Sequence, residues 1–229
     1  MKDLQQLESS LKLKFKNKEI IRSALTHRSY LNEHKNLDID HNERLEFLGD
    51  AVLELAVTEY LFTNYPNPEG ELTNWRSSLV NANTLADLAE EIDLNDYLYL
   101  SRGESKDSSS KARRIILANA YEALIGAIHL DLGYAKAEKF IKDHVLIKLE
   151  EILRMHLYID PKSKMQEKSQ EVYGVTPHYK VLGESGPDHH KKFTVGLYID
   201  KEMITEGEGY SKQEAQINAA AAGLKKKRW

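Results

Sequence analysis

Three acidic residues, Glu43, Glu46 and Asp50, lie close together in one stretch of the chain. Their spacing of three and then four residues places all three side chains on one stripe of an α-helix. Like charges on such a stripe repel each other, and a bound divalent cation would offset this repulsion, because hard cations such as Mg²⁺ prefer oxygen ligands. A solvated acidic helix face has the same pattern. The spacing alone leaves both interpretations open.

Regular helical patterns surround this acidic stretch. The apolar residues interleaved with the acids form a second stripe that we expect to be buried: Leu45, Leu48, Val52 and Leu55. Throughout residues 1–156, apolar residues recur at intervals of three and four, which predicts an almost entirely helical region. Pro, Gly and polar residues at 65–70 and 101–110 predict two loops within it.

The pattern changes after Met155. Asp160-Pro161 is expected to end one helix and to begin another, because Pro is tolerated in the first helical turn. Apolar and polar residues then alternate, which predicts strands at residues 179–181, 193–199 and 203–205, with a turn through Lys201-Glu202. An alanine-rich helical pattern follows from Ser211 onward. The expected order in residues 160–229 is therefore α-β-β-β-α.

Composition narrows the functional classes. The chain of 229 residues is long enough for two domains, and the absence of Cys excludes disulfides, thiolate zinc sites and cysteine nucleophiles. It has no signal-peptide pattern and no run of about 18 apolar residues, so we expect a cytoplasmic protein without a membrane partner. Residues 1–159 contain 20 basic and 26 acidic residues, whereas residues 160–229 contain 12 and 10. This division is compatible with cation binding by the first part and phosphate binding by the second.

Several motifs together resemble a known family. The stretch from Asn42 to Leu53 resembles the signature of the ribonuclease III family. Further segments match that family in the same order: residues 25–29, 69–72, 76–80 and 116–127. The C-terminal part resembles a double-stranded-RNA-binding domain in three segments: residues 164–167, 186–193 and 207–212. These matches cover nearly the whole chain.

The resemblance implies both a fold and an activity. The fold would be an all-helical endonuclease domain at residues 1–156 followed by a small α-β-β-β-α double-stranded-RNA-binding domain at residues 160–229. The activity would be that of a homodimeric, Mg²⁺-dependent endonuclease, with Mn²⁺ able to substitute and without a small-molecule cofactor. Such an enzyme cuts both strands of double-stranded RNA, leaves 5′-phosphates and 3′-overhangs, and serves rRNA and mRNA processing.

The resemblance also implies roles for individual residues. The metal ligands would be Glu46, Asp50, Asn119 and Glu122, with Asp50 and Glu122 catalytic. Glu43 and Glu69 would be outer acids near the dimer interface. Phe47 would project into the partner subunit, and the alternative is burial in its own domain. The roles of His27 and Arg28 stay open, although a histidine at a helix end is usually a local hydrogen-bonding residue, so His27 is interpreted as structural.

Asn119 departs from the family pattern, which usually has Asp at this position. An amide oxygen can still bind Mg²⁺, but the site loses one negative charge and attracts a hard cation less strongly. We expect an active enzyme that demands more metal. An engineered inactivating change and a natural protein that only binds RNA are the alternatives. A hydrolase of small phosphorylated molecules is a further class, which the C-terminal domain disfavours.

The resemblance places the RNA contacts of the C-terminal domain on three segments: Gln166 and Gln170; His189, His190 and Lys191; Ser211 and Lys212. An amide side chain can donate to and accept from the 2′-hydroxyls of RNA, although an exposed polar helix face has the same composition. The two His residues also resemble a metal-binding tract, but no third ligand lies nearby in the sequence. Ser211 also fits an ordinary helix N-cap, and both roles can coexist.

Overall fold

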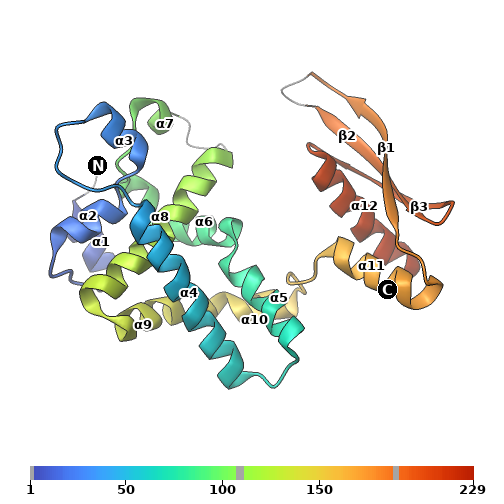
Figure 1. Cartoon of the computed structure of the whole chain (residues 1–229), viewed down its shortest axis with the longest axis horizontal. Coiled ribbons are helices and arrows are strands. Elements are labelled where there is room, and N and C mark those ends of the chain that lie inside the picture. The colour runs from blue at the N-terminus through green and yellow to red at the C-terminus, as the bar shows by residue number, and fades with distance from the viewer. Residues whose placement is uncertain (1–2, 107–110, 188–190) are drawn as a thin grey trace. The chain divides into compact units, whose positions relative to one another are not determined.

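The protein is described by a computed structural model that covers residues 3–106, 111–187 and 191–229 (Figure 1). The chain divides into two compact units, residues 1–158 and residues 159–229. Unit 1 is built from helices, and unit 2 contains a three-stranded antiparallel sheet between two helices. The predicted fold class is therefore confirmed.

Ten α-helices and two short 3-10 helices form the described part of unit 1. The α-helices are α1 (Leu4–Ser10), α2 (Lys18–Ala24), α3 (Arg28–Glu33), α4 (Glu43–Asn64), α5 (Glu69–Val80), α6 (Ala82–Glu91), α7 (Arg102–Lys106), α8 (Lys111–Leu132), α9 (Tyr134–His144) and α10 (Leu149–Arg154). The 3-10 helices are η1 (Leu94–Tyr97) and η2 (Leu146–Lys148). α4 and α8, the two longest, pack against each other at the centre of this unit.

Helix α8 runs through the core of unit 1 and has more buried residues than any other helix of the described chain. Leu117, Tyr121, Leu124 and Ile128 on this helix are almost fully buried. Among the described residues, α8 is the one helix long and apolar enough to cross a membrane, but most of it is buried inside the unit. It is therefore placed as a core helix, and its apolar composition is explained by packing.

Three expectations for unit 1 were wrong in detail. Leu55 is 50% exposed, because the buried face of α4 is formed instead by Gly49, Val52, Leu53 and Ala56. The stretch at 101–110 is not a continuous loop, since residues 102–106 form α7. α5 begins at residue 69, so the turn expected over 65–70 ends before it. Residues 107–110 lie outside the described part of the chain.

Two carboxylates fasten the N-terminal segment to the helical core. The buried Glu8 accepts hydrogen bonds from the Phe15 amide at 2.8 Å and from Lys18 Nζ at 2.5 Å. Asp131, near the end of α8, accepts from the backbone amides of Lys16 at 2.6 Å and Asn17 at 3.2 Å. These contacts fix the path of residues 11–17, which connect α1 to α2 and belong to neither helix.

Unit 2 consists of α11 (Pro161–Tyr173), β1 (His178–Ser185), β2 (Lys192–Ile199), β3 (Glu202–Gly209) and α12 (Lys212–Lys227). The strands are antiparallel in the order β1-β2-β3. One face of the sheet packs on the two helices around Met165, Leu197, Ile204 and Ala219. The strand expected at residues 179–181 is longer than predicted, because backbone pairing with β2 continues beyond the apolar residues. The turn lies at Asp200-Lys201, one residue earlier than expected.

Candidate functional site

Two glycines allow α4 and α8 to touch backbone to backbone. A Cβ atom added to Gly49 on α4 would lie 1.8 Å from the carbonyl oxygen of Glu122 on α8. A Cβ atom added to Gly126 on α8 would lie 2.2 Å from the carbonyl oxygen of Leu45 on α4. Since real Cβ contacts are much longer, only glycine fits at either position.

This helix crossing brings the predicted acids of both helices together. Burial, followed by repulsion from Asp50 and then Glu46, raises the pKa of Glu122 to about 7. Burial and repulsion from Glu43 and Asp50 also raise the pKa of Glu46, while a side-chain hydrogen bond with Asn119 opposes the shift. Glu46 and Asp50 on α4 therefore lie near Asn119 and Glu122 on α8. We call these four residues the acidic cluster.

The acidic cluster has the donor chemistry that Mg²⁺ requires. All four side chains offer oxygen atoms, and a cation among them would relieve the repulsion that raises the pKa of Glu46 and Glu122. Among the residues that the structure describes, however, no group of three or more His, Asp or Glu side chains meets the geometry of a preformed metal site. The donor set fits the ion, and side-chain rotation has to bring the oxygens to coordinating distance.

The two outer acids differ in their surroundings. Glu43 forms an ion pair with Arg28 at 3.3 Å and lies 3.8 Å from His41 Nδ1, and it still contributes to the repulsion at Glu46. Glu69, the first residue of α5, accepts a hydrogen bond from the Thr73 hydroxyl at 2.9 Å. It is not among the groups that shift the pKa of Glu46 or Glu122. Within one chain, the structure therefore brings Glu43 close to the acidic cluster but not Glu69.

His27 and Arg28 position this region. His27 is the N-cap of α3, where its Nδ1 accepts from the Ser29 amide at 3.3 Å, and burial lowers its pKa. The Ser29 hydroxyl in turn accepts from the Ser101 amide at 3.2 Å, which ties α3 to the segment before α7. Arg28 holds Glu43 through the ion pair described above.

Phe47 is 80% exposed, so its ring is not buried within its own chain. It belongs to an apolar stripe on the outer face of α4, together with Leu55, which is 50% exposed, and Phe62, which is 79% exposed. We call these three residues the α4 stripe. Beside Phe47 lies a hollow of about 800 Å³, whose lining includes Ile20, Leu48 and Leu130. One surface thus carries both a protruding ring and a partly apolar hollow.

On unit 2, Gln166 and Gln170 are exposed on one side of α11, and Met165 and Ser169 face the core. Gln170 already donates to the hydroxyl of Thr176 at 2.8 Å, which holds its amide group in place. Gln166 has no such contact in the described part of the chain. Both amides are at the surface, but that of Gln170 is held by Thr176 and that of Gln166 is not.

The other RNA-binding candidates of unit 2 meet where α12 begins. Ser211 is its N-cap and accepts from the Glu214 amide at 3.1 Å. Glu184 on β1 pairs with Lys191 at 3.1 Å and lies 3.9 Å from Lys212. The structure therefore gathers Lys191, Ser211 and Lys212 on one part of the surface. His189 and His190 lie outside the described residues.

Sequence reasoning missed the two glycines at the helix crossing. The available signal is a glycine inside an otherwise strong helical pattern, because it costs about 1 kcal/mol relative to Ala and so needs a reason. Gly49 lies directly before Asp50, and Gly126 lies one helical turn after Glu122. Because the two glycines are this close to Asp50 and Glu122 in the sequence, the backbone contact that they allow also sets where the acidic cluster forms.

Comparison with known proteins gives matches over nearly the whole chain. The family model described as "Ribonuclease-III-like" matches residues 17–149, and the model described as "Double-stranded RNA binding motif" matches residues 161–227. A protein named "Ribonuclease 3" from Nitratiruptor sp. is 41% identical over 226 residues, which cover 98% of this chain and 97% of the relative. A protein of the same name from Clostridium beijerinckii is 42% identical and covers 96% and 94%.

A solved structure agrees with these matches for unit 1. The nuclease domain of ribonuclease III from Campylobacter jejuni, described for structural flexibility in a region involved in dimer formation, is 40% identical to this chain. It superposes with a TM-score of 0.57 over 62% of this chain and 96% of that domain. The similarity thus covers the part of the chain that holds α4 and α8 with the acidic cluster.

Proposed function

Because the chain belongs to the ribonuclease III family and carries both a nuclease domain and a double-stranded-RNA-binding domain, we propose that it is a Mg²⁺-dependent endonuclease that hydrolyses both strands of duplex RNA. The products would carry 5′-phosphates and short 3′-overhangs. The observation that supports this proposal most is the acidic cluster, in which side chains from two helices perturb one another's pKa at the glycine crossing.

Each residue of the acidic cluster has a role in this proposal. Glu46, Asp50, Glu122 and Asn119 would hold the cation, and Asp50 and Glu122 would also act directly on the reacting groups. A bound Mg²⁺ would supply a more acidic water and neutralise charge on the phosphoryl oxygens. Because burial and the neighbouring Asp50 and Glu46 raise the pKa of Glu122 to about 7, its surroundings favour an added positive charge. Glu43 would contribute negative potential from the edge of the cluster.

We further propose a two-fold homodimer in which Phe47 of one subunit enters the hollow beside Phe47 of the other. One acidic cluster cuts one strand, so two clusters related by a two-fold axis match the two strands of a duplex. The exposed α4 stripe and the adjacent 800 Å³ hollow support this arrangement, because a self-complementary interface needs both features on one surface. In that dimer, Glu69 would serve as an outer acid near the interface.

Truncating Phe47 to Ala is expected to weaken the dimer strongly. Burying a Phe side chain contributes about 2 kcal/mol, and a two-fold interface loses two rings, so the dissociation constant should rise about 10³-fold. Sedimentation of the full chain over a concentration series measures this constant. Val172→Ala, which truncates another exposed apolar residue, is the control and should leave it unchanged. An unchanged dissociation constant for Phe47→Ala would show that the ring lies outside the interface.

Asn119 favours one alternative, a protein that binds duplex RNA without cutting it. Its half-buried side chain interacts with Glu46 inside the acidic cluster, where the family usually has a negative charge. We retain the active enzyme as the main proposal, because three carboxylates remain and an amide oxygen is a suitable Mg²⁺ ligand. The expected consequence is a higher metal requirement.

Replacing Asn119 with Asp should therefore lower the Mg²⁺ concentration for half-maximal cleavage by about tenfold, since a unit charge near a cation at a partly buried site contributes on the order of 1 kcal/mol or more. Cleavage of labelled duplex RNA across Mg²⁺ and Mn²⁺ series measures the shift. Asn32→Asp adds the same charge at an exposed position of α3 and should have no effect. If the Asn119→Asp protein cuts the duplex and the native chain does not cut it at any metal concentration in the series, the RNA-binding alternative is correct.

Unit 2 would bind the duplex through three parts of its surface. We propose that Gln166 and Gln170 meet one minor groove, that the segment with His189, His190 and Lys191 meets the next, and that Ser211 and Lys212 bind the intervening phosphates. A phosphate at the start of α12 is physically reasonable because its first backbone amides have no helical partners. We place the enzyme in the cytoplasm, where it would process rRNA and mRNA precursors.

A further inference from the structure

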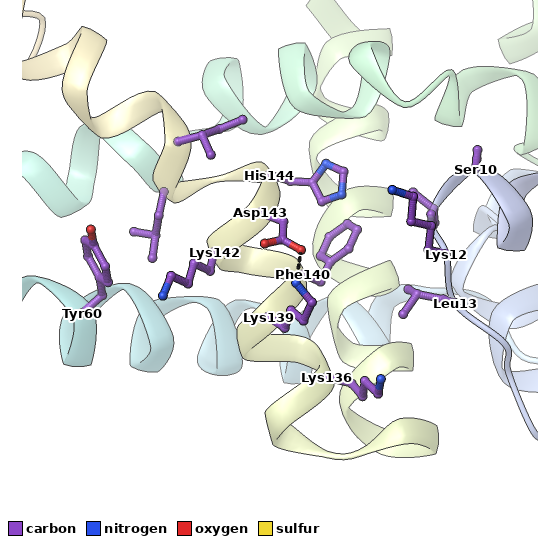
Figure 2. A pocket seen from close by; sticks show the side chains of 13 residues that line it. Ser10, Lys12, Leu13, Tyr60, Lys136, Lys139, Phe140, Lys142, Asp143 and His144 are labelled. Carbon is purple, nitrogen blue, oxygen red and sulfur yellow. Dashed lines mark hydrogen bonds and ion pairs between the residues drawn. The ribbon is translucent and has the colours of Figure 1, made fainter.

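A second charged site lies on unit 1 and shares no residue with the acidic cluster. It is a hollow of about 730 Å³ between the N-terminal segment and the end of α9, and four Lys residues line it: Lys12, Lys136, Lys139 and Lys142. Asp143 is the one carboxylate in its lining. Figure 2 shows Lys12 and Leu13 on the N-terminal segment opposite Phe140 and His144 of α9. We call this site the basic hollow.

Most of the positive charge in the basic hollow is uncompensated. Lys139 forms an ion pair with Asp143 at 2.7 Å. In the described part of the chain, no carboxylate lies within ion-pairing distance of Lys12, Lys136 or Lys142. Unit 1 as a whole has 20 basic and 26 acidic residues, so this gathering of Lys residues runs against its net charge. Figure 2 shows the Lys142 side chain directed toward Tyr60, away from Lys12, so these charges are spread along the hollow and suit an anion with several charged groups.

The backbone holds Lys12 at the edge of the hollow. Lys12 has a φ of 53°, in the left-handed region where Gly is the usual residue after a helix. The turn is closed by hydrogen bonds from Lys12 N to Ser9 O at 3.2 Å and from Leu13 N to Glu8 O at 2.9 Å. Glu8 is itself held by the Phe15 amide and by Lys18. A long cationic side chain therefore occupies a position where glycine would be less strained.

The rest of the lining defines the kind of ligand. Leu11, Leu13, Leu146 and Ile147 contribute apolar walls, and the rings of Phe140 and His144 pack at 4.5 Å between centroids. Lys ammonium groups bind phosphate as compact point charges on flexible stems, without the planar geometry that Arg demands. A partly apolar hollow of this size with cations around it fits phosphate groups attached to a larger molecule.

We propose that the basic hollow binds phosphate groups, through Lys12, Lys136 and Lys142. Two sources share this chemistry, the backbone of an RNA and the polyphosphate chain of a free nucleotide. The RNA source rests on the proposed function, whereas the free phosphate source does not. Lys139 is partly neutralised by Asp143 and contributes less.

The test uses two probes on the full chain without divalent metal, so that RNA is not cut. Calorimetry with inorganic tripolyphosphate measures binding of free phosphate, and the affinity for duplex RNA over a NaCl series measures backbone contacts. The hollow variant is Lys12→Gln/Lys136→Gln/Lys142→Gln. The matched control, Lys35→Gln/Lys106→Gln/Lys111→Gln, removes the same charge elsewhere on unit 1.

For the hollow variant we expect tripolyphosphate binding about tenfold weaker than for the native chain, or a salt slope for RNA binding reduced by about one for each Lys that contacts a phosphate. The control should behave like the native chain with both probes. A change with tripolyphosphate alone identifies a free phosphate ligand, and a change with RNA alone identifies the backbone. Lys142→Glu, a single surface change, repeats the test with less risk to folding. The proposal is overturned if neither probe distinguishes hollow variant from control.

Discussion

Replacing Glu122 with Gln should reduce cleavage of duplex RNA by about three orders of magnitude while leaving RNA affinity unchanged. The amide keeps the shape and one oxygen donor, but it removes a negative charge that interacts with Asp50 and Glu46. A catalytic metal stabilises the transition state by several kcal/mol, and about 4 kcal/mol corresponds to a factor of about 10³ in rate. Single-turnover cleavage and binding of the same labelled duplex provide the two measurements.

Two further proteins sharpen this experiment. Glu138→Gln removes a carboxylate from the exposed side of α9 and should cut at the native rate. Asn119→Asp/Glu122→Gln restores the total charge of the acidic cluster without restoring the carboxylate at 122. If this double variant recovers most of the activity, the cluster acts mainly through its summed charge; if it does not, Glu122 acts as a specific ligand. A Glu122→Gln rate within tenfold of native would remove Glu122 from the proposed mechanism.

Replacing Gly49 with Ala should destabilise unit 1 by about 3 kcal/mol or more and should abolish cleavage. The added Cβ would lie 1.8 Å from the Glu122 carbonyl oxygen, and two helix backbones have to separate to admit it. Overpacking a core costs roughly 1–3 kcal/mol when side chains can move aside, and backbone cannot do so. Because the clash is with Glu122 itself, separation of the helices also displaces a residue of the acidic cluster.

The measurement can be confined to unit 1. The chain has two Trp residues, Trp75 buried in unit 1 and Trp229 in unit 2, so Trp229→Phe leaves a fluorescence signal from unit 1 alone. Gly70→Ala is the matched control, because Gly70 is also helical but has no atom within 4 Å of an added Cβ. It should stabilise unit 1 by about 0.5–1 kcal/mol. Equal effects of the two substitutions on unfolding would refute the close crossing.

Residue spacing and family resemblance predicted the fold class and the acids that the helix crossing brings together. The buried face of α4 was less predictable. The helical spacing of Leu55 predicts burial with Leu48 and Val52, but its side chain is exposed to solvent. Periodicity identifies which side chains share a face, but it does not reveal which face the backbone of a neighbour will approach. The face that α8 approaches is set by Gly49 and Gly126, and glycines do not contribute to an apolar pattern because they have no side chain.

The remaining features depend on contacts distant in the sequence. Lys12 and Lys142 are far apart along the chain, so no local pattern indicates a shared hollow. Its existence requires the path of the N-terminal segment, which Asp131 fixes through two backbone amides. Similarly, the ion pair between Arg28 and Glu43 joins a residue whose role the sequence leaves open to one interpreted as an outer acid. Such pairings follow from tertiary packing and not from local sequence.

The carboxylate of Glu184 has a consequence for how unit 2 distinguishes ligands. It lies 3.1 Å from Lys191 and 3.9 Å from Lys212, and so acts as a built-in counter-ion for both. An incoming anion has to displace the Glu184 carboxylate from these Lys residues, and this carboxylate is present at high effective concentration because it belongs to the same chain. A lone chloride or phosphate gains little from the exchange. A polymer that engages several distant contacts at once can displace Glu184, so we expect this carboxylate to favour the binding of long duplexes over short fragments.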